Sequence, residues 1–254
     1  MFETNKTQVF SQADVKGKLM KKPLTLLLLL IFCHSFGQQF RYPKIKTEAQ
    51  SISNFIPSKW KLLASAKGDL NGDKNDDIAF IIQYQDSVSI EKIEFEEKDT
   101  VITQPRILIL AFFNSILKKY ELIEQSNSFI LNHDNPNMDD PFQNITIKKG
   151  VLRIDFAIFM NMGSWSISNN SYAFRYQENE FRLIGADYNH THRGSGETEN
   201  RSYNFLSKKV KISTGNISND NKKIILRHFK FNKLKTFKTF NQPFTYEIEK
   251  DFNI

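Results

Sequence analysis

Residues 142–159, "FQNITIKKGVLRIDFAIF", carry the pattern that decides the fold. Apolar and polar residues alternate on both sides of Lys149 and Gly150, a pair with the composition of a tight turn. Alternation with period two places every second side chain on the same face of a strand. The stretch therefore predicts a β-hairpin with one buried face.

The same alternation recurs along the chain. Residues 171–185, "SYAFRYQENEFRLIG", predict a second hairpin that turns at 177–180, and residues 201–213, "RSYNFLSKKVKIS", predict a third that turns near Lys208. Further strands are expected at residues 61–66, 78–83, 107–113, 119–124 and 222–231. The run "RILILAFF" is apolar without a break, which predicts a central strand covered on both faces.

These patterns predict a mainly β fold. We expect a single domain over residues 45–254, made of largely antiparallel strands in a hairpin-rich sheet or sandwich. One short N-terminal helix is expected at 48–55, because Thr47 can cap it and Pro57 ends it. The acidic stretch 84–104 and the polar stretch 186–200 are expected to be long loops.

The N-terminal region has the composition of a secretory signal. Residues 20–38, "MKKPLTLLLLLIFCHSFGQ", contain two lysines, an apolar block and a tail of small residues, and residues 1–19 resemble an upstream extension. The apolar block is too short to span a bilayer as a helix. We therefore expect an exported protein, periplasmic or extracellular, with no stable membrane insertion after the signal is cleaved.

Cleavage of this segment changes the composition of the chain. It removes five lysines and two acidic residues, so the net charge falls from +7 to +4, and it removes Cys33, the only cysteine. Without a disulfide the exported protein must rely on its core and on any bound metal.

Between Lys208 and Lys238, ten lysine or arginine residues stand against one acid. This segment is either a solvated surface or a basic face for an anionic polysaccharide or membrane, since nucleic acid is not expected outside the cell.

Residues 68–82, "GDLNGDKNDDIAFII", place acidic and amide side chains at alternate positions directly before an apolar strand. Calcium takes six to eight hard oxygen ligands, and a short loop supplies them when alternate side chains converge. The ligands predicted by this spacing are Asp69, Asn71, Asp73, the main-chain carbonyl of Asn75, and Asp77. The alternative is an Asx-rich turn without metal, held by side-chain to backbone hydrogen bonds.

The spacing excludes an EF-hand, because Phe80 stands where its bidentate glutamate would fall. The stretch instead resembles the calcium-binding loop of FG-GAP or VCBS-type repeats, the units of the integrin alpha β-propeller. That resemblance implies that Asp69, Asn71, Asp73 and Asp77 bind Ca²⁺ through their side chains. It covers one loop and does not imply a propeller. The chain is also similar to uncharacterised exported bacterial proteins that contain a single motif of this kind.

The sequence identifies no catalytic residue, and the serines of "MGSWSIS" lack a nucleophile elbow. The first hypothesis is a non-enzymatic binding or structural module, stabilised by calcium, with an unknown protein or glycan partner. The alternative is an envelope hydrolase of unfamiliar type, with its site residues in loops 134–141, 161–170 and 186–200.

Overall fold

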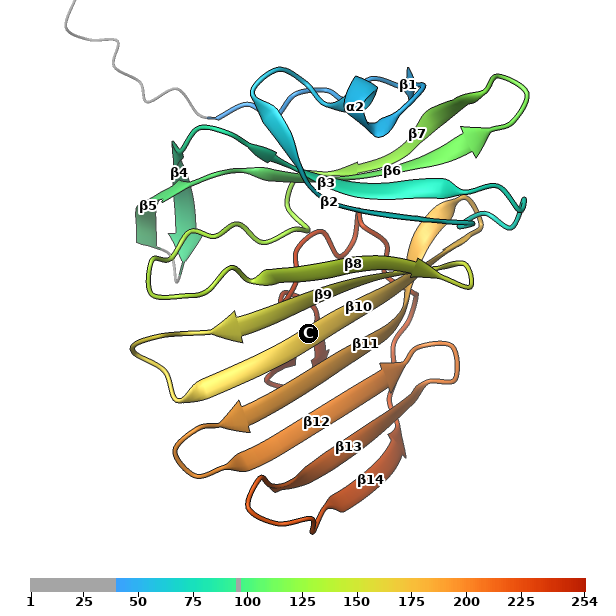
Figure 1. Cartoon of the computed structure of the whole chain (residues 1–254). Coiled ribbons are helices and arrows are strands. Elements are labelled where there is room, and N and C mark those ends of the chain that lie inside the picture. Colours follow the sequence, from blue (N-terminus) through green and yellow to red (C-terminus); the bar gives the residue numbers. More distant parts are fainter. Residues whose placement is uncertain (1–39, 95–96) are drawn as a thin grey trace, which may run out of the picture. The chain divides into compact units, whose positions relative to one another are not determined.

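The computed structural model describes residues 40–94 and 97–254 (Figure 1). The predicted extension at 1–19 and the predicted signal at 20–38 lie outside these residues. The fold is mainly β, as predicted, and every strand ladder within the described residues is antiparallel.

The predicted hairpin at 142–159 is confirmed as β8, Phe142–Lys148, and β9, Val151–Phe159. Lys149 and Gly150 both have positive φ, 52° and 72°, as a two-residue hairpin turn with the right twist requires. Ile145 faces Ile154 across the ladder. Both side chains are buried, so the alternation in the sequence sets the register.

The hairpin begins a sheet of seven strands in the order β14-β13-β12-β11-β10-β9-β8, in which neighbours in sequence pair (Figure 1). The remaining strands are β10, Ser166–Gln177; β11, Glu180–His192; β12, Glu197–Asn204; β13, Lys209–Asn216; and β14, Lys223–His228. Glu178 and Asn179 join β10 to β11 with φ of 51° and 61°. The second and third predicted hairpins are thus also confirmed.

A second sheet has five strands in the order β1-β7-β6-β3-β2. Its strands are β1, Glu48–Ala49; β2, Trp60–Gly68; β3, Asp77–Tyr84; β6, Arg106–Asn114; and β7, Lys119–Ser126. The unbroken apolar run lies on β6, whose residues from Ile107 to Ala111 are fully buried. Leu108 and Leu110 face one hydrophobic cluster and Ile107 and Ile109 face another, which explains the run.

The larger cluster, called here the main core, joins both sheets to the C-terminal segment 229–254. β2 lies against β8 where the sheets meet. The C-terminal segment contains a small hairpin, β15, Glu247–Glu249, and β16, Phe252–Asn253, and contributes Phe229, Phe237 and Phe240 to the main core. The inner face of the seven-stranded sheet is therefore covered partly by this segment.

The N-terminal helix is shorter than predicted. Helix α2 spans Ile52–Phe55 and packs Phe55 against one face of the five-stranded sheet. Glu48 and Ala49 instead form β1, which pairs with β7. Pairing at a sheet edge satisfies these backbone groups better than one more helical turn in a short segment. Within the described residues no helix is long and apolar enough to cross a membrane.

The prediction that residues 84–104 form a loop is wrong. Strand β4, Val88–Glu94, pairs with β5, Glu97–Thr103, as a separate two-stranded hairpin. Val88, Ile90 and Val101 alternate with polar neighbours. This local β pattern outweighs the acidic composition that suggested a loop.

The prediction that residues 186–200 form a loop is also wrong. β11 continues to His192 and β12 begins at Glu197, so only residues 193–196 form a turn. Asn189 pairs with Asn169 on one side and with Asn200 on the other. Backbone pairing with β10 and β12 on its two sides keeps this part of β11 extended, although its residues are polar.

Phe129 connects the parts of the main core. It is fully buried in the segment after β7, and its ring lies within 6.3 Å, centroid to centroid, of Phe156, Tyr172, Phe174, Phe237 and Phe240. Phe129→Ala should lower the free energy of unfolding by about 3–5 kcal/mol, because it leaves a cavity among these rings. Urea denaturation measures the loss.

The control is Ile116→Ala, at a side chain that is 88% exposed, where a change within about 0.5 kcal/mol is expected. Equal effects of the two substitutions would contradict the central position of Phe129.

Candidate functional site

The predicted calcium loop connects β2 to β3 at the edge of the five-stranded sheet. Gly68 pairs with Asp77 where the two strands reach the loop. A Cβ atom on Gly68 would lie 2.7 Å from Cγ2 of Ile147, so glycine allows β2 to approach β8 closely. The loop is therefore attached at a point where the two sheets meet.

Side-chain oxygens in the loop accept hydrogen bonds from the loop's own backbone amides. Asp69 accepts from Gly72 at 2.6 Å and from Lys74 at 2.9 Å. Asn71 Oδ1 accepts from the backbone amide of Asp73. Asp73 Oδ1 accepts in turn from the backbone amide of Asn75. The loop is thus an Asx-rich turn that holds these three side chains in fixed directions.

Asp77 differs from the other acids because it is fully buried. Its Oδ2 accepts from the Leu70 amide at 2.8 Å and its Oδ1 from the Phe113 amide at 3.0 Å, which links the loop to the end of β6. Burial raises the pKa of this carboxyl despite these hydrogen bonds, and the charge of Asp73 raises it further. Asp77 makes no ion pair within the described part of the chain.

The donor chemistry of the loop suits a hard cation, because all the predicted ligands are oxygens. Each carboxylate oxygen that accepts one hydrogen bond retains a further lone pair. The predicted ligands, however, do not surround a common point. Within residues 40–94 and 97–254, no group of three or more His, Cys, Asp or Glu side chains gathers closely enough to hold a metal ion. Binding would therefore require the three aspartates to draw together.

The segment 134–141 has a structural contact at its end. Asp140 forms a bidentate ion pair with Arg106, with N–O distances of 2.8 and 2.5 Å. The side chain of Arg106 is only 2% exposed and also donates to Gln83 and to the carbonyl of Leu131. Burial acts to raise the pKa of Asp140, but the hydrogen bonds and charge of Arg106 outweigh it and hold the pKa below its usual value.

The segments 161–170 and 186–200 meet at one end of the seven-stranded sheet, where Arg193 donates to the carbonyls of Met160 and Ser164. Trp165 is 67% exposed beside this turn. His192 Nδ1 lies 2.9 Å from Ser195 Oγ, and Ser195 donates to Glu197. In a catalytic triad the acid contacts the histidine, whereas here it contacts the serine. The arrangement locks a turn.

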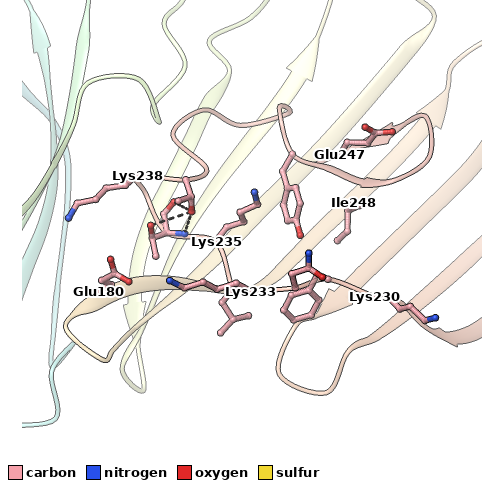
Figure 2. Close-up of a pocket in the computed structure, with 13 residues that line it drawn as sticks. Glu180, Lys230, Lys233, Lys235, Lys238, Glu247 and Ile248 are labelled. Atoms are coloured by element: carbon pink, nitrogen blue, oxygen red, sulfur yellow. Dashed lines mark hydrogen bonds between the residues drawn. The ribbon is translucent and has the colours of Figure 1, made fainter.

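A lysine-lined pocket was not identified from the sequence. It has a volume of about 520 Å³ and lies in the C-terminal segment (Figure 2). Its basic side chains are Lys230, Lys233, Lys235 and Lys238. The run of cations between Lys208 and Lys238 was the only signal for it. That run does not show which lysines share a pocket, because several of its cations lie on β13 and β14 and only the later ones line the pocket.

No protein-family model matches the chain, and neither the curated proteins nor the solved structures contain a match.

The Arg106 ion pair gives a test that separates a structural from a catalytic use of segment 134–141. Asp140→Asn should lower the free energy of unfolding by about 2–3 kcal/mol, less than the roughly 3–5 kcal/mol for a fully buried pair, because Asp140 is partly open to solvent. The pair stabilises above the unfolded pKa of about 3.9 and is lost as pH falls through the lower folded pKa. The variant should therefore lose less stability on acidification, measured by urea denaturation between about pH 2 and 7.

Asp139→Asn is the matched control, because the Asp139 side chain is exposed and its carboxylate accepts from Asn161. A loss of the same size in both variants would contradict a specific role for the Arg106 pair.

Proposed function

We propose that the protein is an exported, non-enzymatic binding or structural module whose fold is stabilised by one calcium ion in loop 69–77. The ligands are the side chains of Asp69, Asn71, Asp73 and Asp77, with the carbonyl of Asn75. Export is part of the proposal and rests on the signal-like composition of residues 20–38.

The observation that carries the calcium proposal is the buried carboxylate of Asp77. A buried charge is costly unless it is paired, and two amide donors do not bring the pKa of Asp77 down to its ordinary value. A divalent cation beside Asp73 and Asp77 would supply the missing positive charge. The amide of Asn75 lowers the pKa of Asp73, so this second carboxyl is ionised and available.

A structural role follows from the position of Asp77. Its two hydrogen bonds join the loop to β3 and to the end of β6, so a cation there would hold the loop and two strands of the five-stranded sheet together. External calcium is plentiful enough to fill even a weak site of this kind. The ion would stabilise the fold and would not take part in chemistry.

Thermal melting with calcium and with chelator tests the proposal. When free calcium is about a hundred times its dissociation constant, the folded state gains about 2.7 kcal/mol, which raises the melting temperature. Asp73→Ala should abolish the difference between the two curves. Asp76→Ala should preserve it, because Asp76 carries the same charge in the same loop but is not a proposed ligand.

Lys74 offers a variant with the opposite effect. It has a φ of 68°, which asparagine tolerates, and its ammonium group opposes a cation in the loop. Lys74→Asn should therefore bind calcium severalfold more tightly by calorimetric titration.

In the melting experiment, superimposable wild-type curves across millimolar calcium would overturn the calcium proposal.

Export is tested separately by expressing the full chain in a Gram-negative host. The mature protein should appear in the periplasmic fraction, with an intact mass that places its first residue at 38–40. Leu27→Arg, which interrupts the apolar block, should leave the precursor uncleaved. Uncleaved wild-type protein in the cytoplasm would refute this part of the proposal.

A further inference from the structure

The lysine-lined pocket is formed because the C-terminal segment turns its aromatic residues inward. Phe229, Phe237 and Phe240 are buried in the main core, and Phe237 stacks on Phe174 at 4.2 Å between centroids. The lysines that stand between these anchors are left on the outer side, where Figure 2 shows them around the pocket.

The backbone of the pocket is also held in place. Leu183 of β11 donates to the carbonyl of Lys235 at 2.8 Å, and Arg182 and Thr236 form an isolated bridge. Thr236 and Thr239 close a turn, with the Thr236 amide donating to the Thr239 hydroxyl at 2.9 Å. The pocket is therefore preorganised by the sheet beneath it.

The pocket carries an excess of positive charge. Its charged lining comprises four lysines and two glutamates, and none of these lysines forms an ion pair with a described residue. Glu180 is partly neutralised by Arg182, 3.7 Å away. Lys235 is half-buried and lies 4.8 Å from the centre of the Tyr246 ring, a contact that fixes its direction.

The directions of the lysines indicate what kind of anion fits. In Figure 2, Lys238 and Lys230 point away from each other at opposite ends of the pocket, and Glu180 and Glu247 also lie at opposite ends. The ammonium groups do not converge on one point, as a single phosphate would require. They suit a ligand whose negative charges are spaced along its length.

Among linear polyanions, the pocket favours an acidic polysaccharide. A single-stranded nucleic acid needs open aromatic faces for its bases, but both aromatic rings of the pocket are covered. Lys235 and Phe205 lie on the Tyr246 ring, and Lys208 lies over the Phe231 ring. A membrane surface needs a flat or protruding basic face, whereas these lysines line a hollow. Its volume of about 520 Å³ falls in the range of sites for small molecules, with room for a few sugar rings.

We infer that this pocket binds a segment of an acidic polysaccharide, whose carboxylate or sulfate groups pair with Lys230, Lys233, Lys235 and Lys238. The site does not use loop 69–77. Failure of the polysaccharide inference and failure of the calcium proposal are therefore separate results.

Calorimetric titration of the mature protein with hexagalacturonate tests the inference, in EDTA so that calcium does not bridge the sugar. The wild type should bind the acidic hexasaccharide and not neutral maltohexaose, and binding should weaken between about 50 and 200 mM NaCl. The double variant Lys230→Gln, Lys233→Gln should bind about tenfold more weakly, because two ion pairs are lost. Both side chains are exposed, so the melting temperature should be unchanged.

The matched control is Lys222→Gln, Lys223→Gln, which removes the same charge from the same basic segment outside the pocket. It should change the affinity by less than about twofold. Equal losses in the two double variants, or equal binding of maltohexaose, would overturn the inference. Tighter binding to inorganic phosphate or to phosphatidylglycerol vesicles than to hexagalacturonate would overturn it as well.

Discussion

The structure of residues 40–254 depends on covering the apolar inner face of the seven-stranded sheet. The five-stranded sheet meets that sheet at β8 and at the β10–β11 end, where the Phe112 ring of β6 lies 4.8 Å from the Tyr176 ring. The rest of the face needs another cover. The C-terminal segment supplies it, and Phe129 joins this segment to β9 and β10 through ring contacts on every side. Burial of apolar surface is the dominant favourable term in folding, and aromatic side chains bury a large area each. The same burial turns the lysines of the segment outward, so the proposed binding pocket is a consequence of core packing.

The buried Asp77 imposes a second constraint, which is electrostatic. Its two amide partners come from the loop and from β6, so the carboxylate connects segments that are distant in sequence. The Arg106–Asp140 pair has a similar position at the other end of β6, but there the opposite charge is present in the chain itself. At Asp77 no such charge is present within the described residues. Burial raises the pKa of both carboxyls, but at Asp140 the hydrogen bonds and charge of Arg106 outweigh burial and lower the pKa. This contrast is the physical reason to look for a cation at one site and not at the other.

Local features of the sequence were sufficient to predict most strands and three hairpins. The turns at Lys149-Gly150 and Glu178-Asn179 need only two residues with positive φ, and the apolar run on β6 reflects burial on both faces. Residues 186–200 were assigned wrongly because their strand character comes from pairing partners on both sides, which composition does not reveal. The ligand spacing of loop 69–77 was visible in the sequence, but the burial of Asp77 was not. The lysine pocket was also hidden, since Phe229, Phe237 and Phe240 lie in a segment of turns and bends, where no strand or helix period indicates which side chains are buried.

Seven of the ten cations in the basic segment 208–238 fall into two groups with different physical roles. Four of its lysines line the pocket, whereas Lys222, Lys223 and Arg227 lie on or beside β14, the edge strand of the seven-stranded sheet. That edge exposes Ile224 and Leu226, at 55% and 72%, and an exposed apolar edge invites pairing with another chain. If two copies of β14 paired antiparallel about Ile225, Lys223 of each would face Arg227 of the other, and like charges in that position are destabilising. Lys223 and Arg227 would therefore disfavour self-association through this edge, and Arg227 is in addition paired with Glu249. The pocket lysines form no ion pair with a described residue, as the proposed ligand binding requires.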